Sequence, residues 1–162
     1  MKITKLILSL ILVTIITTTG TALDVNEEAP TFSITTLDGK AFNLIDYRGK
    51  KKVHLVFWAT WCPACTDKVP ELKKMYNNKT SNDVKFLAIN VGSNDSLKKV
   101  NKYIKKHKIK YAAAFDKGSK ISTAYEIYGI PSQFVIDKKG NIQYKGYKTP
   151  VINNKKKKTN WL

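Results

Sequence analysis

The sequence predicts one α/β domain, built on a mixed central β-sheet that helices flank and an N-terminal β-hairpin precedes. Its 162 residues are enough for one ordinary domain with its two ends. Two continuous apolar runs, residues 52–59 and 84–91, are typical of strands buried on both faces of a sheet. Segments with helical spacing of apolar residues alternate with them, and this alternation predicts a sheet covered by helices.

The first expected element is the hairpin. Asp38-Gly39 lies between two β-prone runs, residues 31–34 and 41–43, and Asp-Gly in that position favours a tight turn. Residues 46–50 are expected to form a further turn that leads into the first buried strand.

A strand over residues 52–59 and a helix over residues 63–76 follow. Pro63 suits the first turn of a helix, because its missing N–H would have no intrahelical partner there. The helical stripe has the spacing i, i+3, i+4, i+7 and consists of Val69, Leu72, Lys73 and Tyr76.

The second half repeats the pattern of strand and helix. A second buried strand is expected over residues 84–91, and a helix over 96–107 begins at a capping serine, Ser96. The remaining expected elements are a short strand at 112–115, a short helix at 119–128, and a closing pair of strands at 133–136 and 142–147.

The N-terminus resembles an export signal. Two lysines precede an apolar stretch, and no charge occurs from Leu6 to Leu23, a run of 18 residues. Gly20 and Ala22 are the small residues expected before a cut after Ala22. Residues 1–22 are therefore predicted to be a secretory signal peptide or an uncleaved membrane anchor. Either alternative places the domain in the periplasm or at the extracytoplasmic face of the cell membrane.

The chain is strongly basic, with a formal net charge of +17. Arg48 is its only arginine and the other 28 basic residues are lysines, which argues against base-specific reading of nucleic acid. Contact with anionic lipid remains an alternative to a merely solvated surface. The domain is expected over residues 23–147, with a lysine-rich C-terminal tail over 148–162.

The chemistry is expected at Cys62-Pro63-Ala64-Cys65, where a buried strand meets the start of a helix. Thiols at this spacing can close a disulfide within one helical turn. The helix N-terminus favours a thiolate on Cys62, which makes it the exposed, attacking sulfur, and Cys65 the more buried resolving thiol.

A purely structural disulfide would close too short a loop to stabilise the fold much. The two histidines, His54 and His107, lack the paired spacing that a zinc or copper site needs, so we expect no metal.

The segment Val56–Cys65, followed by Pro70-Glu71-Leu72, resembles the thioredoxin superfamily. Within it, the chain is most similar to exported thiol–disulfide oxidoreductases of the TlpA/ResA/CcmG type. Ala29-Pro30-Thr31-Phe32 resembles the N-terminal hairpin of that group. Tyr128–Ser132 resembles the segment that holds its cis-proline, and Phe134–Asp137 resembles its closing hairpin.

The resemblance implies a role for each matching residue. Cys62 becomes the nucleophile, Cys65 the resolving thiol, and Pro131 the cis-proline that faces the disulfide. Ile130 would present its backbone to an extended partner peptide, and Trp61 would lie partly exposed beside Cys62. Trp58, by contrast, is expected in the core. The resemblance implies no diffusible cofactor, protein thiols and disulfides as substrates, a membrane thiol donor of electrons, and a monomer.

Two positions depart from the family pattern. The glutamate that usually follows the second cysteine by three residues is replaced by Lys68, and the buried aspartate of thioredoxin is replaced by Val56. A lysine near the site favours thiolates, which makes the disulfide more oxidising. His54 could serve as a base instead, although a histidine in a buried strand is more often hydrogen-bonded core.

The resemblance therefore implies an enzyme that reduces particular exported protein disulfides, for example in cytochrome c maturation. One alternative is a thiol oxidant of exported proteins. Another is a non-catalytic basic docking module, with inert or copper-binding cysteines. Peroxidase activity is disfavoured, because the chain lacks the proline–threonine–cysteine motif of the neighbouring families that have it.

Overall fold

The structure is a computed structural model that describes residues 23–77 and 83–150. The expected signal or anchor at 1–22, and the tail from 151 onward, lie outside these residues. In the described ranges, no helix has the length and apolar character needed to cross a membrane.

A five-stranded mixed sheet forms the centre of the molecule, as predicted, with strand order β5-β4-β3-β6-β7. β3 (Lys52–Trp58) pairs in parallel with β4 (Val84–Asn90) and antiparallel with β6 (Ser132–Ile136). β5 (Ala113–Phe115) and β7 (Ile142–Gly146) lie on the outer sides. The central strands are those whose sequences are apolar at nearly every position, because both of their faces are covered.

Successive residues of β3 pack against different layers. Trp58 lies against Tyr103 of one layer, with ring centroids 4.8 Å apart, whereas Phe57 contacts Tyr125 and Phe134 on the opposite face. Trp58 is buried, as the sequence predicts. The central strand thus connects two separate apolar layers into one core.

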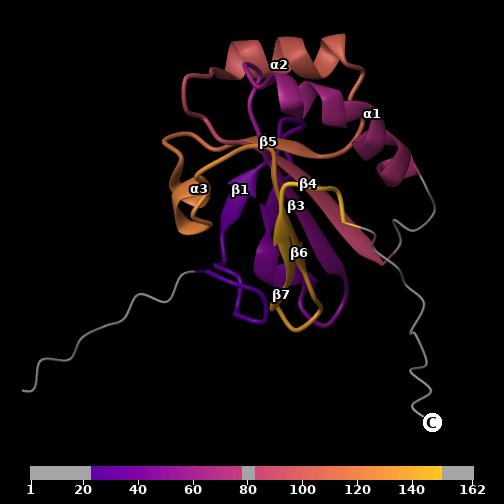
Figure 1. The fold of residues 1–162 in the computed structure, drawn as a ribbon, viewed down its shortest axis with the longest axis vertical. Coiled ribbons are helices and arrows are strands. Elements are labelled where there is room, and N and C mark those ends of the chain that lie inside the picture. Colours follow the sequence, from indigo (N-terminus) through magenta and orange to yellow (C-terminus); the bar gives the residue numbers. More distant parts are fainter. Residues whose placement is uncertain (1–22, 78–82, 151–162) are drawn as a thin grey trace, which may run out of the picture.

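The longer helices cover the face of Trp58. α1 (Pro63–Asn77) follows β3 and buries Cys65, Val69 and Leu72, and α2 (Leu97–Lys106) buries Val100 and Tyr103. Figure 1 shows α1 and α2 together, and α3 (Lys120–Ala124) apart from them. Ser96 caps α2 as predicted, because its side chain accepts the N–H of Lys99 at 3.3 Å. The helix predicted over 119–128 is shorter than expected and ends at Ala124.

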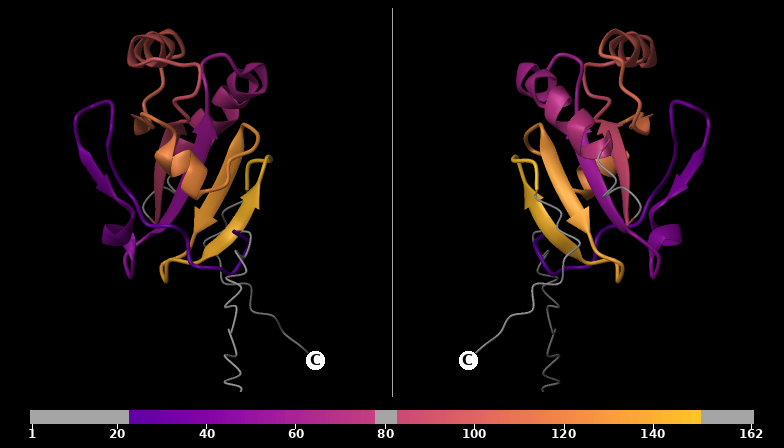
Figure 2. Two further views of the ribbon diagram at one scale, coloured as in Figure 1. Left: turned by 90° about the vertical axis from the view of Figure 1, so that its left-hand side faces the viewer. Right: turned by 90° about the vertical axis from the view of Figure 1, so that its right-hand side faces the viewer.

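The predicted hairpin forms a separate two-stranded sheet from β1 (Ser33–Thr35) and β2 (Ala41–Asn43). The turn expected after it begins earlier, as the 3-10 helix η1 (Leu44–Tyr47). The hairpin joins the outer side of β5, where Leu37 N–H donates to the carbonyl of Ala113 at 2.7 Å. Figure 2 shows the hairpin at one side of the molecule and β6 and β7 at the other.

His54 is a buried polar residue of β3. Its Nε2 lies 2.9 Å from Oε1 of Gln133, and its ring packs edge-on against Phe86. This is the hydrogen-bonded core histidine that the sequence favours. Burial lowers the pKa of His54 to about 4, although the hydrogen bond to Gln133 opposes the change. The ring is therefore neutral in the folded protein at pH 7.

This histidine makes the stability of the fold sensitive to acid. Because the folded pKa is below the ordinary 6.5, the unfolded chain binds the extra proton first, and stability is lost as the pH falls from 6.5 toward 4. We expect about 2 kcal/mol of unfolding free energy to be lost through His54 between pH 7 and pH 5. His54→Phe should remove that part of the pH dependence in urea unfolding curves. His107→Asn, which changes the other histidine, should leave most of it in place.

Candidate active site

The two cysteines lie at the carboxyl end of β3, where the chain passes into α1. Cys62 immediately precedes the helix and Cys65 lies in its first turn, with Cα atoms 5.2 Å apart, and the two form a disulfide. β3 ends at Trp58, four residues connect it to the helix, and Pro63 begins α1, where its missing N–H needs no intrahelical partner.

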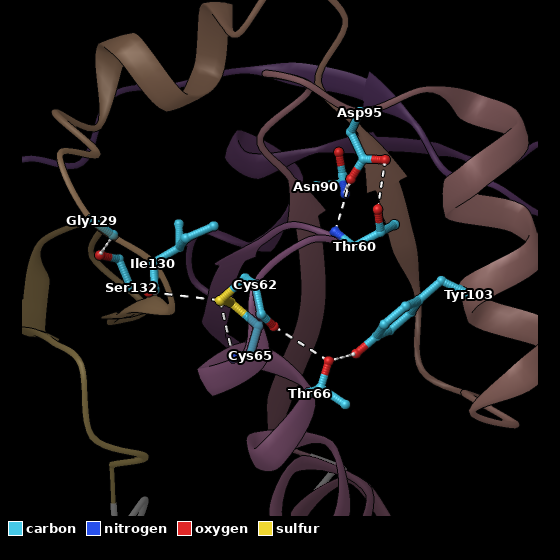
Figure 3. The surroundings of a disulfide bond; sticks show 10 residues. All are labelled: Thr60, Cys62, Cys65, Thr66, Asn90, Asp95, Tyr103, Gly129, Ile130 and Ser132. Atoms are coloured by element: carbon cyan, nitrogen blue, oxygen red, sulfur yellow. Dashed lines mark hydrogen bonds between the residues drawn. A yellow bond between two sulfur atoms is a disulfide. The ribbon is translucent and has the colours of Figure 1, made fainter.

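Cys62 Sγ lies among polar backbone groups. The N–H of Cys65 points at it from 3.0 Å, and the carbonyl oxygen of Ile130 lies 3.8 Å away (Figure 3). In the reduced protein that N–H stabilises a thiolate on Cys62, together with the other unpaired N–H groups of the helix start. The carbonyl of Ile130 can accept the proton of a Cys62 thiol. The environment of Cys62 is thus suited to both protonation states.

The prediction that Cys62 is the exposed sulfur is wrong for the oxidised protein. Cys62 is 5% exposed and Cys65 is 4% exposed. The reason is the segment Gly129–Ser132, which lies against Cys62 through the carbonyl of Ile130 (Figure 3). The two sulfurs differ in what surrounds them rather than in exposure.

Cys65 adjoins a small cavity of about 10 Å³ beneath the disulfide. Val56, Lys68 and Pro131 are also in its lining, so the two positions that depart from the family pattern both line the cavity beside Cys65. No carboxylate lines this cavity. Lys68 Nζ instead pairs with Glu71 at 2.9 Å, on the outer side of α1. The only charged side chain in the lining of this cavity is therefore Lys68, and its ammonium group is paired with Glu71.

The proline segment connects α3 to β6. The peptide bond between Ile130 and Pro131 is cis, and Ser132 Oγ donates to the carbonyl of Gly129 at 2.5 Å. The antiparallel pairing of Phe57 with Ser132 brings this segment to the end of β3. The structure thus places Ile130 and Pro131 beside the disulfide, and their role in partner binding stays a prediction.

Trp61 is half exposed, at 50%, and directly precedes Cys62, as the sequence predicts. Its indole N–H donates to the carbonyl of Ser93 at 2.9 Å. A large aromatic surface is therefore held in a fixed position beside the reactive sulfur. Such a surface suits contact with a partner protein, because the ring is large and its position is already fixed.

A hydrogen-bond network around Asp95 was not anticipated from the sequence. Its carboxylate accepts the backbone N–H of Thr60 at 2.8 Å and the Thr60 hydroxyl at 2.9 Å. It also accepts Asn90 Nδ2 at 2.8 Å (Figure 3) and the N–H of Ser96 at 3.0 Å. Polar residues after two adjacent parallel strands were the signal that could have revealed it, because such positions meet at one edge of a sheet.

Asp95 is stabilised as an anion. Partial burial acts to raise its pKa, but the hydrogen bonds from Thr60, Asn90 and Ser96 together hold the pKa below its ordinary value. A second contact positions the start of α1, where Thr66 Oγ1 lies 3.0 Å from the hydroxyl of Tyr103 on α2. Both contacts connect the cysteine segment to the β4–α2 region.

Metal ligands do not gather near the cysteines. Among residues 23–77 and 83–150, no three His, Cys, Asp or Glu side chains converge in a way that could hold a metal ion. His54 contacts Gln133 and Phe86 rather than either cysteine, so it is not placed as a base for them.

The arrangement of sheet, disulfide and proline segment can be compared with known proteins. A profile of the AhpC/TSA family matches residues 25–145. The chain belongs to this thioredoxin-like family. The match spans the hairpin, nearly all of the central sheet and both helices of the cysteine face, and so covers most of the described domain.

Individual relatives make the assignment more specific. The thiol-disulfide oxidoreductase ResA of Bacillus thuringiensis subsp. konkukian is 33% identical over 129 residues, 78% of this chain and 73% of the relative. ResA of Geobacillus kaustophilus is 34% identical over 126 residues, 78% of this chain and 71% of the relative. The crystal structure of StoA from Bacillus subtilis has a TM-score of 0.66 at 27% identity, covering 73% of this chain and 87% of StoA.

These relatives identify the activity. The chain is a thiol-disulfide oxidoreductase of the ResA type, with its CXXC motif at residues 62–65. The thioredoxin-like fold implied by the resemblance is confirmed.

Asp95 is expected to hold the cysteine segment in place. Asp95→Ala removes four hydrogen bonds to an anionic acceptor and should lower the unfolding free energy by about 2 kcal/mol or more, measured by urea unfolding of the oxidised protein at pH 7. Asp46→Ala, which removes an exposed aspartate that accepts only from the side chain of Asn43, is the matched control. Equal stability of the two variants would contradict this role.

Lys68 is expected to make the disulfide more oxidising, because its charge favours the thiolates of the reduced form. Lys68→Gln should therefore make the reduction potential more negative by roughly 10 to 20 mV, a modest change because the lysine is partly exposed and paired with Glu71. The potential is measured in glutathione buffers. Lys74→Gln removes the same charge from an exposed position of α1 and should change it less. A similar change of the reduction potential in both variants would mean that the net charge of the protein, and not the position of Lys68, causes the effect.

Proposed function

We propose that this oxidoreductase is exported and reduces disulfides of particular extracytoplasmic proteins, such as the haem-site cysteines of apocytochrome c. The observation that supports this most is the environment of Cys62 Sγ. It faces the N–H of Cys65 at 3.0 Å and the carbonyl of Ile130 at 3.8 Å. A sulfur that a helix start stabilises as a thiolate, beside a segment that can align a partner, is suited to disulfide exchange.

The reaction begins from the reduced protein. The Cys62 thiolate attacks one sulfur of the partner disulfide, forming a mixed disulfide and releasing the other partner sulfur as a thiolate. The Cys65 thiol loses its proton and attacks Cys62 Sγ, which releases the second partner sulfur. The partner gains two electrons and two protons, and Cys62 and Cys65 become the disulfide seen in the structure. A membrane thiol donor then reduces that disulfide by the same steps in reverse.

Partner binding is proposed at the surface formed by Trp61, Ile130 and Pro131. Trp61 is half exposed beside Cys62, and the carbonyl of Ile130 already lies against the sulfur. An extended segment of the partner can pair with the backbone of Ile130, as in strand addition. The partner sulfur would then be presented to Cys62 from the side opposite to Cys65.

Export is proposed from the N-terminal sequence. Two lysines, an apolar stretch and the small residues Gly20 and Ala22 are the pattern of a secretory signal. Outside the cytoplasm the protein needs a source of electrons, which is why a membrane thiol donor is part of the proposal. Contact of the lysine-rich surface with anionic lipid, and a monomeric state, are further expectations.

A thiol oxidant is the second candidate, and Lys68 is the observation that favours it. The cavity beside Cys65 is lined by this lysine and contains no carboxylate to take the thiol proton. The charge of Lys68, whose Nζ is paired with Glu71, favours the thiolates of the reduced form and so raises the potential of the disulfide. The non-catalytic docking module has no comparable support, since the relatives are enzymes of disulfide exchange.

The reduction potential of the Cys62–Cys65 pair decides whether the protein reduces or oxidises its partners. A value near or below about −230 mV supports the reductant, and a value near about −120 mV supports the oxidant. Equilibration with glutathione or dithiothreitol buffers, followed by mass spectrometry of the trapped thiols, gives this value.

The roles of the cysteines can be separated by substitution. Cys62→Ser should abolish reduction of insulin disulfides, because the attacking sulfur is lost. In the Cys65→Ser variant, Cys62 should still attack the partner disulfide. Because the resolving thiol is missing, the mixed disulfide should accumulate and be visible as a covalent adduct on a non-reducing gel. Circular dichroism of both variants checks that they are folded. An adduct formed by Cys62→Ser and not by Cys65→Ser would reverse the assignment.

A further inference from the structure

Leu23, the first residue that the structure describes, is held by charged side chains from two distant elements. Its backbone N–H donates to Oε2 of Glu126 at 3.1 Å, and its carbonyl accepts from Nζ of Lys145 at 2.6 Å. Its side chain is buried, with 9% of the residue exposed. A segment that merely passed over the surface would not need both backbone groups of one residue satisfied by partners more than 100 residues away.

The residues that follow Leu23 are fixed to the same side of the sheet. Asn26 N–H donates to the carbonyl of Ile142 at 2.8 Å, and Ala29 N–H donates to that of Gly140 at 2.9 Å. The N–H of Asp24 donates to Oε2 of Glu27 at 2.9 Å. The segment from Leu23 to Ala29 is therefore docked along the start of β7.

Glu126 is well placed to bind a cation at Leu23 N. It follows α3 in a left-handed backbone conformation, with φ of 50°. Its closest basic side chain is Lys145, whose Nζ is 4.0 Å from Oε2 and is engaged with the carbonyl of Leu23. Both side chains are about one-third exposed, at 30% and 34%. The carboxylate thus has the neutral N–H of Leu23 as its nearest donor, at 3.1 Å, and Lys145 as a counter-charge at 4.0 Å, the outer limit of an ion pair.

The sequence independently marks the bond before Leu23. Gly20 and Ala22 are the small residues expected three positions and one position before a signal-peptide cut. Hydrolysis of the Ala22–Leu23 bond by a signal peptidase consumes one water molecule. It gives Ala22 a carboxylate and Leu23 an amino group that takes up a proton at neutral pH.

We propose that Leu23 is the mature N-terminus and that Glu126 is the binding site for its newly formed α-ammonium group. This rests on the export that we propose above. Cleavage replaces a neutral N–H donor by a charged group with three donors at the same place, and charge-assisted hydrogen bonds are roughly twice as strong as neutral ones. Lys145 donates to the carbonyl of Leu23 at 2.6 Å and is 4.0 Å from Glu126, so an ammonium in the place of the Leu23 N–H, at 3.1 Å, would be the closer cation to that carboxylate.

The proposed ammonium site lies near the segment that leads to the cis-proline. An open pocket of about 410 Å³ is lined by Leu23, Glu126, Tyr128, Lys145 and Tyr147, among others. Glu126 lies two residues before Tyr128, at the start of the chain that leads to Ile130 and Pro131. The released N-terminus therefore anchors the base of the loop that faces the disulfide.

The first experiment determines the N-terminus. The full chain is expressed in a bacterium that secretes it, and mass spectrometry of the exported protein is expected to find Leu23 as the first residue. A cut at another bond would overturn this inference while leaving export intact. A chain that remains in the cytoplasm with its leader would overturn both this inference and the proposed export.

The second experiment tests the ion pair in the processed protein. The rate at which a succinimidyl ester acylates the α-amine of Leu23 at pH 7 is followed by peptide mass spectrometry. Glu126→Gln should raise this rate about fivefold, because an ion-paired, hydrogen-bonded ammonium is less available as the free amine. Asp24, Glu27, Glu126 and Lys145 are the charged groups around this amine in both measurements.

The matched control is Glu27→Gln, which neutralises another carboxylate that accepts a backbone N–H of the same segment. It should leave the acylation rate within twofold of the unsubstituted protein. Circular dichroism and the intact disulfide confirm that each variant is folded. An unchanged rate in Glu126→Gln, or equal changes in both variants, would overturn the assignment of Glu126.

Discussion

The parallel pairing of β3 with β4 is the constraint on which the rest of the structure depends. Seven consecutive residue pairs, from Lys52–Val84 to Trp58–Asn90, align the two strands so that they end together. Parallel strands must be joined by a crossover, and α1 supplies it on the face of Trp58. The cysteine segment after β3 and the Asp95 segment after β4 therefore meet at one edge. The hydrogen bonds from Thr60 to Asp95 follow from that register and secure it.

The antiparallel strand on the other side of β3 completes the site. Because Phe57 pairs with Ser132, the end of β3 and the beginning of β6 lie side by side, and the proline segment must approach Cys62. The disulfide is thus held between two loops from opposite neighbours of one strand. One loop orients Trp61 through Ser93, and the other covers Cys62 with the carbonyl of Ile130. Neither loop has to be rigid by itself, since sheet pairing fixes where each one begins.

The sequence predicted the elements and the reactive pair well because these depend on local patterns. Apolar runs identified β3 and β4. Two cysteines three residues apart, at a strand–helix junction, identified the chemistry. What it did not predict depends on contacts between distant residues. The burial of Cys62 requires Ile130, 68 residues away, and the anionic Asp95 requires Thr60, 35 residues away. The contact of Leu23 with Glu126 spans 103 residues. The order of strands in the sheet determines such pairings, so local patterns do not give them. The exception is Asp95, which the polar residues after two adjacent parallel strands could have indicated.

The local character of the cysteine pair has a consequence for the order in which the protein is built. Synthesis proceeds from the N-terminus, so Cys62 and Cys65 emerge together, long before the residues of β6 and the proline segment exist. One helical turn suffices to bring the two sulfurs within reach, whereas the loop that later covers Cys62 needs nearly the complete sheet. Until β6 and the proline segment have been synthesised, both sulfurs are accessible to small-molecule and protein oxidants or reductants. Their first oxidation or reduction can therefore take place before the sheet is complete.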